Sequence, residues 1–273
     1  MKCALAAACC SLLLLGAGSP AHGKSGTEAA AVSVAPVHFS STKKVLYIGD
    51  SLSVGAFGDA MQAALIAGGS GRERVAIYAS CGSSVQHWLS SEPVHVTPCG
   101  YRETTSASRI FEDYHNGVKP RPMETPKIEK LLKKHRPDIV IIQLGTNHFD
   151  TLEKGGMAAL ARQEEIFEEF ARNIVKTTGN LKQVIWILPP DSSKFASSIQ
   201  SAISKTIRQV AERHNFSTID SRKMTRYIYG KTGGDGVHYS TEAALQWARD
   251  VITEINRLLM PRVHVNSSES KKR

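Results

Sequence analysis

The chain has 273 residues, of which 41% are hydrophobic and 22% charged, and a formal net charge of +9 at pH 7. This length allows one sizeable core, and beyond the first residues no apolar run reaches the roughly 20 residues of a spanning helix, so we expect no transmembrane anchor. The positive charge favours an anionic wall or envelope polymer as partner, or serves only solubility. With no arginine-rich arm and no nucleic-acid motif, we expect no nucleic-acid partner.

The first residues resemble an export signal. Met1 and Lys2 form a short basic start, an apolar run follows, and small residues end it near Ala21 and Gly23. This pattern predicts a signal peptide over residues 1–23 and export to the periplasm or medium. An uncleaved anchor and a lipoprotein site at Cys9 or Cys10 are the alternatives. The remaining divisions are a flexible lead-in (24–42), one folded domain (43–261) and a disordered basic tail (262–273).

Apolar runs alternate with helical patterns along the folded domain. The runs, which predict buried strands, cover residues 43–49, 75–80, 137–144, 183–188 and 217–220. Apolar residues at helical spacing predict helices over residues 55–67, 126–135, 158–177, 197–214 and 241–259. The alternation predicts an α/β fold, in which helices cover both faces of a parallel sheet. Residues 88–124 show little periodicity, and we expect a long loop there.

Three short motifs follow the ends of the first three predicted strands. They contain Ser51, Gly82 and Asn147. Ligands of open parallel sheets bind at the carboxyl ends of the strands, so the topology alone predicts that these three residues converge.

The residue types at these positions suit acyl transfer. Ser51 needs a base to act as a nucleophile, and His238 is the candidate, oriented by Asp235 three residues earlier. The backbone N–H groups of Ser51 and Gly82 and the amide of Asn147 could stabilise the developing oxyanion.

Four blocks in this order resemble the SGNH (GDSL) hydrolase family. They are Gly49-Asp50-Ser51-Leu52, the glycine at position 82, Gly145-Thr146-Asn147 and Asp235-Gly236-Val237-His238. The resemblance implies a three-layer α/β/α sandwich with a parallel sheet, the flavodoxin-like SGNH hydrolase fold, and neither metal nor organic cofactor. The family commonly has Asp after the Asn of its third block, whereas this chain has His148, either a residue lining the acyl or sugar pocket or a solvated loop residue.

Two cysteines, Cys81 and Cys99, lie outside the predicted signal peptide. In an exported protein such a pair predicts a disulfide. A zinc site with His87 and His95 is the alternative, but its spacing matches no common zinc pattern.

These features predict a secreted serine esterase for small acyl esters, and first of all an O-acetylesterase of peptidoglycan or another envelope polysaccharide. Alternatives with the same triad are a lipase or lysophospholipase and an O-acetyltransferase. A catalytically silent carbohydrate-binding module is the non-enzymatic alternative.

Overall fold

The structure is a computed structural model that describes residues 34–68, 71–114, 118–178 and 183–260. The predicted signal peptide and tail, most of the lead-in, and His115 lie outside the described residues, and the domain boundaries stay predictions. None of the helices in the described part of the chain is both long and apolar enough to cross a membrane.

A central sheet of seven strands has the order β4-β3-β2-β1-β5-β6-β7. The strands are β1 (Val45–Gly49), β2 (Val75–Ser80), β3 (Gly100–Thr104), β4 (Arg109–Asp113), β5 (Ile139–Gln143), β6 (Gln183–Ile187) and β7 (Ser217–Ile219). The five strands expected from apolar runs, β1, β2, β5, β6 and β7, are all present and pair in parallel. The predicted parallel sheet is therefore confirmed over most of its width.

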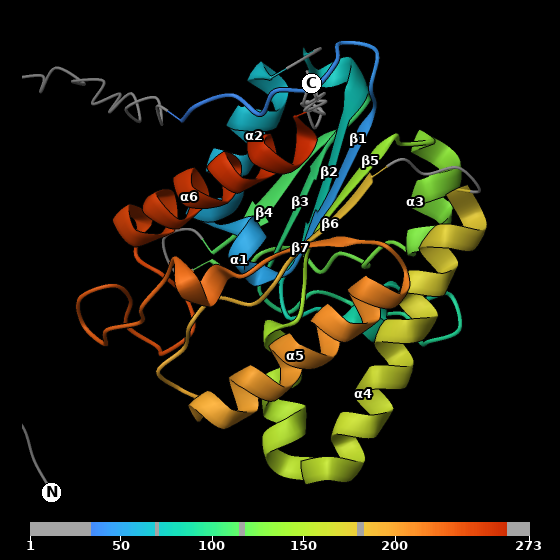
Figure 1. Ribbon diagram of the computed structural model, residues 1–273. Coiled ribbons are helices and arrows are strands. Elements are labelled where there is room, and N and C mark those ends of the chain that lie inside the picture. Colours follow the sequence, from blue (N-terminus) through green and yellow to red (C-terminus); the bar gives the residue numbers. More distant parts are fainter. Residues whose placement is uncertain (1–33, 69–70, 115–117, 179–182, 261–273) are drawn as a thin grey trace, which may run out of the picture. The chain divides into compact units, whose positions relative to one another are not determined.

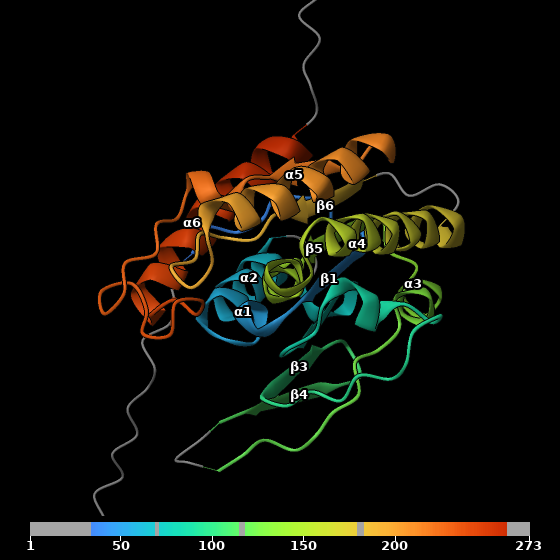
Figure 2. The same ribbon diagram turned by 90° about the horizontal axis from the view of Figure 1, so that it is seen from below.

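The expectation of a long loop over residues 88–124 is wrong in part, because this segment contains β3 and β4. Both strands pair antiparallel at one edge of the sheet (Figure 2). Their sequences are rich in charged residues, and the covered face of β3 holds Arg102, only 3% exposed. Its guanidinium donates to the Asp59 carboxylate at 2.7 Å and to the Val54 carbonyl at 2.6 Å. A buried arginine paired with a carboxylate thus replaces the apolar residue that would have marked the strand.

Helices cover both faces of the sheet, as expected for a three-layer sandwich (Figure 1). One layer contains α2 and α6, and the other contains α3, α4 and α5. The bounds are α1 (Ser51–Val54), α2 (Ala56–Ala67), α3 (Ile128–His135), α4 (Phe149–Thr178), α5 (Ser197–Arg213) and α6 (Thr241–Leu259). Gly156, with φ of 57°, interrupts α4, so the helix expected from residue 158 is its second segment.

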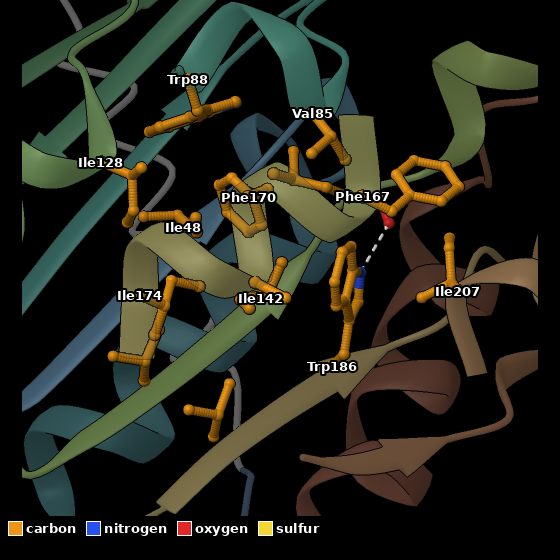
Figure 3. Packing of buried hydrophobic residues seen from close by; sticks show 14 of the residues in the cluster. Ile48, Val85, Trp88, Ile128, Ile142, Phe167, Phe170, Ile174, Trp186 and Ile207 are labelled. Atoms are coloured by element: carbon orange, nitrogen blue, oxygen red, sulfur yellow. Dashed lines mark hydrogen bonds between the residues drawn. The ribbon is translucent and has the colours of Figure 1, made fainter. Parts of the chain in front are cut away.

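The strands are apolar throughout because alternate side chains enter two separate cores. Leu46 and Ile48 of β1 pack with α3, α4 and α5, whereas Val45 and Tyr47 pack with α2 and α6. Figure 3 shows the first core, in which Trp186 of β6 lies fully buried near α4 and α5 and donates to the Leu144 carbonyl at 3.0 Å. Burial of both faces explains the near-continuous apolar runs.

The register of the sheet places the three motif-bearing strand ends side by side. Gly49, the last residue of β1, pairs with Ala79 of β2 and with Gln143 of β5. The chain therefore leaves the three strands at nearly the same level, and the loops with Ser51, Gly82 and Asn147 begin next to one another.

Candidate active site

Ser51 begins α1, directly after the turn that follows β1. Asp50 is the N-cap of this helix, and its carboxylate accepts from the Leu52 N–H at 3.0 Å. Asp50 is fully buried, and burial raises the pKa of its carboxyl to about 7. As the N-cap of α1, Asp50 braces the turn that presents Ser51.

The structure brings Ser51, His238 and Asp235 into one hydrogen-bonded chain. The Ser51 hydroxyl lies 2.9 Å from His238 Nε2, and His238 Nδ1 lies 2.5 Å from Asp235 Oδ2. With a proton on Nδ1, the ring donates to Asp235 and accepts from Ser51. This arrangement suits a base that withdraws the serine proton.

The acid of this chain is held by its own loop. Asp235 Oδ1 accepts from the backbone N–H groups of Val237 at 2.8 Å and His238 at 2.7 Å. Although partial burial raises it, the hydrogen bonds from the His238 ring and from these N–H groups lower the pKa of Asp235 to about 2. The carboxylate of Asp191, which follows Pro189-Pro190, accepts from the Tyr227 N–H at 2.8 Å and takes no part in this hydrogen-bonded chain.

Tyr227 supports the loop that carries Asp235 and His238, a contact that the sequence did not reveal. Its hydroxyl accepts from the N–H groups of Gly236 at 2.9 Å and Asp235 at 3.2 Å, and lies 3.1 Å from the carbonyl of His238. The side chain is 6% exposed. One buried hydroxyl thus contacts both ends of the Asp-x-x-His segment.

Gly82 requires glycine because of its backbone conformation and its packing. Its φ is 77°, in the left-handed region that disfavours other residues, and an added Cβ would lie 3.2 Å from Pro98 Cγ. The glycine is therefore needed for the backbone turn after β2 and for its packing against the segment before Cys99.

Asn147 lies in the loop after β5 and is half-buried. Its side-chain Nδ2 donates to the carbonyl of Ser83 at 2.8 Å, which links the loop after β5 to the loop after β2. Since an amide nitrogen carries two hydrogens, the second remains for another acceptor. The side chain thus has a fixed orientation, and one of its N–H groups is free to donate to a ligand.

His148 corrects both sequence-based alternatives, because it neither faces solvent nor lines an open pocket. It is 1% exposed and packs edge-on against Phe167, with 4.7 Å between ring centroids. Its Nε2 accepts from the Val85 N–H at 3.1 Å, and burial lowers the pKa of the ring to about 3. It is a neutral core histidine that holds the loops after β2 and β5 together.

Cys81 and Cys99 form a disulfide, with 5.5 Å between their Cα atoms, which confirms the predicted pair and excludes the zinc alternative. Within the part of the chain that the structure describes, no cluster of His, Cys, Asp or Glu could hold a metal ion. His87 and His95 stack on each other, with 4.1 Å between centroids. His87 Nδ1 accepts from the Ser84 N–H at 3.0 Å, so the pair packs the loop.

A buried lysine fixes the far side of the same loop. Lys127 is 8% exposed, and its ammonium donates to the carbonyls of His87, Glu92 and Pro93 at 2.9–3.1 Å. Burial lowers the pKa of this ammonium. No local pattern in the sequence indicates this contact, since a lysine before a helix usually faces solvent.

The hydrogen-bonded triad is open to solvent. The side chains of His238 and Asp235 are 50% and 55% exposed, and Ser51 is half-buried. A bulky substrate could therefore reach the Ser51 hydroxyl without passing through a tunnel.

Comparisons with known proteins agree with this fold. The family described as GDSL-like Lipase/Acylhydrolase matches residues 45–251. Among curated proteins, none matches the chain.

The fold is similar to that of solved structures at low sequence identity. TesA has a TM-score of 0.53 and 15% identity, over 80% of this chain and 100% of that one. An acetylxylan esterase from Geobacillus stearothermophilus, solved as a catalytic mutant, has a TM-score of 0.50 and 17% identity, over 80% and 95%. A peptidoglycan O-acetylesterase has a TM-score of 0.47 and 13% identity, over 81% and 91%. The likeness to these structures concerns the fold.

Because the family match spans most of the 273 residues, from β1 into α6, the chain belongs to the GDSL-like lipase/acylhydrolase (SGNH hydrolase) family and is an ester hydrolase.

Proposed function

We propose that the protein is an exported esterase that removes acetyl groups from a polysaccharide through a Ser51–His238–Asp235 triad. The observation that carries the proposal is the hydrogen-bonded chain of 2.9 and 2.5 Å between these side chains. In the first step His238 Nε2 takes the Ser51 proton while Oγ attacks the ester carbonyl. The protonated ring then passes this proton to the leaving sugar hydroxyl, which leaves an acetyl-enzyme.

The second step hydrolyses this intermediate. Water loses a proton to His238 Nε2 as it attacks the acetyl carbonyl, and the proton then returns to Ser51 Oγ as acetate departs. Asp235 stabilises the imidazolium in both steps, and a carboxyl with a pKa of about 2 stays ionised over the neutral range.

The oxyanion of each tetrahedral intermediate would lie against three donors. We assign them as the backbone N–H groups of Ser51 and Gly82 and the second amide hydrogen of Asn147. The first amide hydrogen of Asn147, bonded to the Ser83 carbonyl, fixes its orientation before substrate binds. Each such donor contributes about 3 kcal/mol to the transition state.

The acetylated polysaccharide is supported by the openness of the site. The half-exposed His238 and Asp235 leave room for a polymer, and no long apolar stripe near the motifs would hold a fatty acyl chain. The predicted signal peptide and the Cys81–Cys99 disulfide support an exported protein, where envelope polysaccharides lie. The open triad also favours hydrolysis over transfer to a second sugar, because transfer requires exclusion of water.

The experiment compares purified wild type, Ser51→Ala and, as a matched control, Ser198→Ala, which removes an exposed hydroxyl from α5. We expect wild type and Ser198→Ala to hydrolyse p-nitrophenyl acetate and Ser51→Ala to be inactive. Equal rates of hydrolysis in wild type and Ser51→Ala would refute the triad, and absence of hydrolysis in both would favour the carbohydrate-binding module.

Substrate class is tested with the same proteins. We expect p-nitrophenyl acetate to be cleaved faster than the octanoate, and acetate to be released from an O-acetylated polysaccharide. A preference for octanoate would instead favour a lipase-type esterase, and acetyl transfer to an added oligosaccharide at the expense of free acetate would favour a transferase.

A further inference from the structure

A pocket of about 380 Å³ lies between residues 224–232 and the first two turns of α6. This volume falls within the roughly 300–1,000 Å³ of small-ligand sites. The pocket shares its walls with the segment that supplies the acid and base, because Tyr239 follows His238 directly. The N–H of Ser240, also in the lining, donates to the Thr232 carbonyl at 2.7 Å.

The less exposed part of the lining is apolar. Trp247 is 1% exposed and stacks on Phe57, whereas Tyr239 and Met224 are half-buried. The Tyr239 hydroxyl donates to the Asp191 carbonyl at 2.5 Å, which fixes the ring. Tyr239 therefore offers a fixed, partly exposed aromatic surface that suits the C–H face of a sugar ring, and buried Trp247 supports it from behind.

The exposed part of the lining is cationic. Arg226, Lys231 and Arg249 contribute three positive charges, against the one acid Glu242. Among the described residues, neither these cations nor Glu242 form an ion pair. Several other exposed arginines are paired, such as Arg213 with Glu164 at 2.7 Å. The pocket lining therefore carries three cations and one carboxylate, and its net charge is positive.

We propose that this pocket binds a carboxylate-bearing sugar unit of the polysaccharide whose acetyl ester is cleaved at Ser51. The sugar ring would pack on the half-buried ring of Tyr239, and its carboxylate would face Arg226 and Lys231. The inference rests on the proposed function, and it narrows the substrate to acidic polysaccharides. The cations of the pocket are exposed, so salt screens their attraction for the carboxylate. The affinity for the acidic polysaccharide therefore falls as added salt shortens the Debye length below about 8 Å.

The test uses two forms of one polymer. O-acetylated polygalacturonate carries a carboxylate on each sugar, and the same polymer after reduction of these groups to alcohols carries none. We expect wild type to release acetate from the acidic form with the higher kcat/KM, and added NaCl to reduce that preference. Equal values for the two forms at low salt would overturn the inference.

Arg226→Ala/Lys231→Ala localises the effect. We expect the acidic-to-neutral ratio of kcat/KM to fall about tenfold, since each exposed charge contact is worth up to about fivefold. Arg172→Ala/Lys205→Ala is the matched control, because it removes two exposed cations outside the pocket. An unchanged ratio in the pocket variant, or the same fall in the control, would overturn the inference.

Failure of the proposed function would look different. If neither polymer releases acetate, calorimetric binding of trigalacturonate to Ser51→Ala still decides the inference. Binding that is lost on adding Arg226→Ala/Lys231→Ala supports the pocket. Absence of binding, or equal binding with and without these changes, overturns it.

Discussion

The imidazole of His148 joins two loops of the site, because its Nε2 accepts the Val85 N–H at 3.1 Å. The bond requires a neutral ring, and burial among aromatic neighbours such as Phe167 keeps the ring neutral. A residue that follows the oxyanion candidate Asn147 thus positions the loop of the other candidate, Gly82.

His148→Gln tests the neutral histidine through the pH dependence of stability. Burial lowers the pKa of His148 from 6.5 to about 3. Between these two pH values the His148 ring is protonated in the unfolded chain and neutral in the folded chain. The stabilisation is complete above pH 6.5 and is lost as pH falls toward 3, by up to about 1.4 kcal/mol per unit. Gln can accept the Val85 N–H without titrating.

We expect the free energy of unfolding in urea to fall less between pH 6.5 and 4 in His148→Gln than in wild type. His38→Gln, at an exposed histidine, is the control and should follow wild type. Parallel curves for wild type and His148→Gln would contradict this account.

Gly82→Ala tests the backbone turn. At a φ of 77° an alanine costs about 1–2 kcal/mol, and its Cβ would press on Pro98. We expect that loss in the free energy of unfolding, with a larger loss in kcat because the oxyanion loop moves. Gly71→Ala has a similar φ of 65° but meets no atom within 4 Å. If both variants retain wild-type kcat, Gly82 does not position the loop.

Tyr227→Phe removes the hydroxyl beneath the acid–base loop. Two N–H groups, of Asp235 and Gly236, then lose their acceptor, and the loop shifts relative to Ser51. We expect kcat for p-nitrophenyl acetate to fall about tenfold to a hundredfold with KM little changed, since small misplacements of a base are costly. Tyr229→Phe, at a 72% exposed tyrosine, should keep wild-type kcat. An unchanged kcat in Tyr227→Phe would show that Tyr227 does not position the loop.

Cys81→Ser/Cys99→Ser tests the disulfide. The bridge joins two cysteines that are 18 residues apart in the sequence. Removal of such a bridge lowers the free energy of unfolding by about 3 kcal/mol. Cys81 directly precedes Gly82, so loss of the bridge also frees the turn that carries this oxyanion candidate. We therefore expect activity, measured under conditions where the variant stays folded, to fall further than the stability loss explains. Labelling of both thiols in untreated native protein would refute the bridge.

The sequence predicted the parts of the fold in which each strand is apolar on both faces. The alternation of Leu46 and Ile48 with Val45 and Tyr47 between two cores makes these runs easy to recognise. β3 escaped recognition because Arg102 occupies a buried position through its bonds to Asp59 and Val54. The charge of Arg102 is paired only through a tertiary contact with Asp59, and no local sequence pattern indicates such a contact.

The candidate site was predictable where topology alone brings residues together. Ser51, Gly82 and Asn147 follow strand ends, and the Asp-x-x-His spacing places acid beside base. His148 and Tyr227 were not predictable in the same way. The burial of His148 depends on Phe167 and Val85, and Tyr227 acts through backbone N–H groups that any residue would offer.

The pairing of Gly49 with Gln143 limits where chains of this family can change in length. One residue inserted within β5 would displace Asn147 by about 3.3 Å relative to Ser51 and exchange the cores that Ile141 and Ile142 enter. An insertion at the opposite end of the sheet, before Ile139, leaves both relationships intact. We therefore expect natural length variation to collect in the loops at the amino ends of the strands, away from the triad.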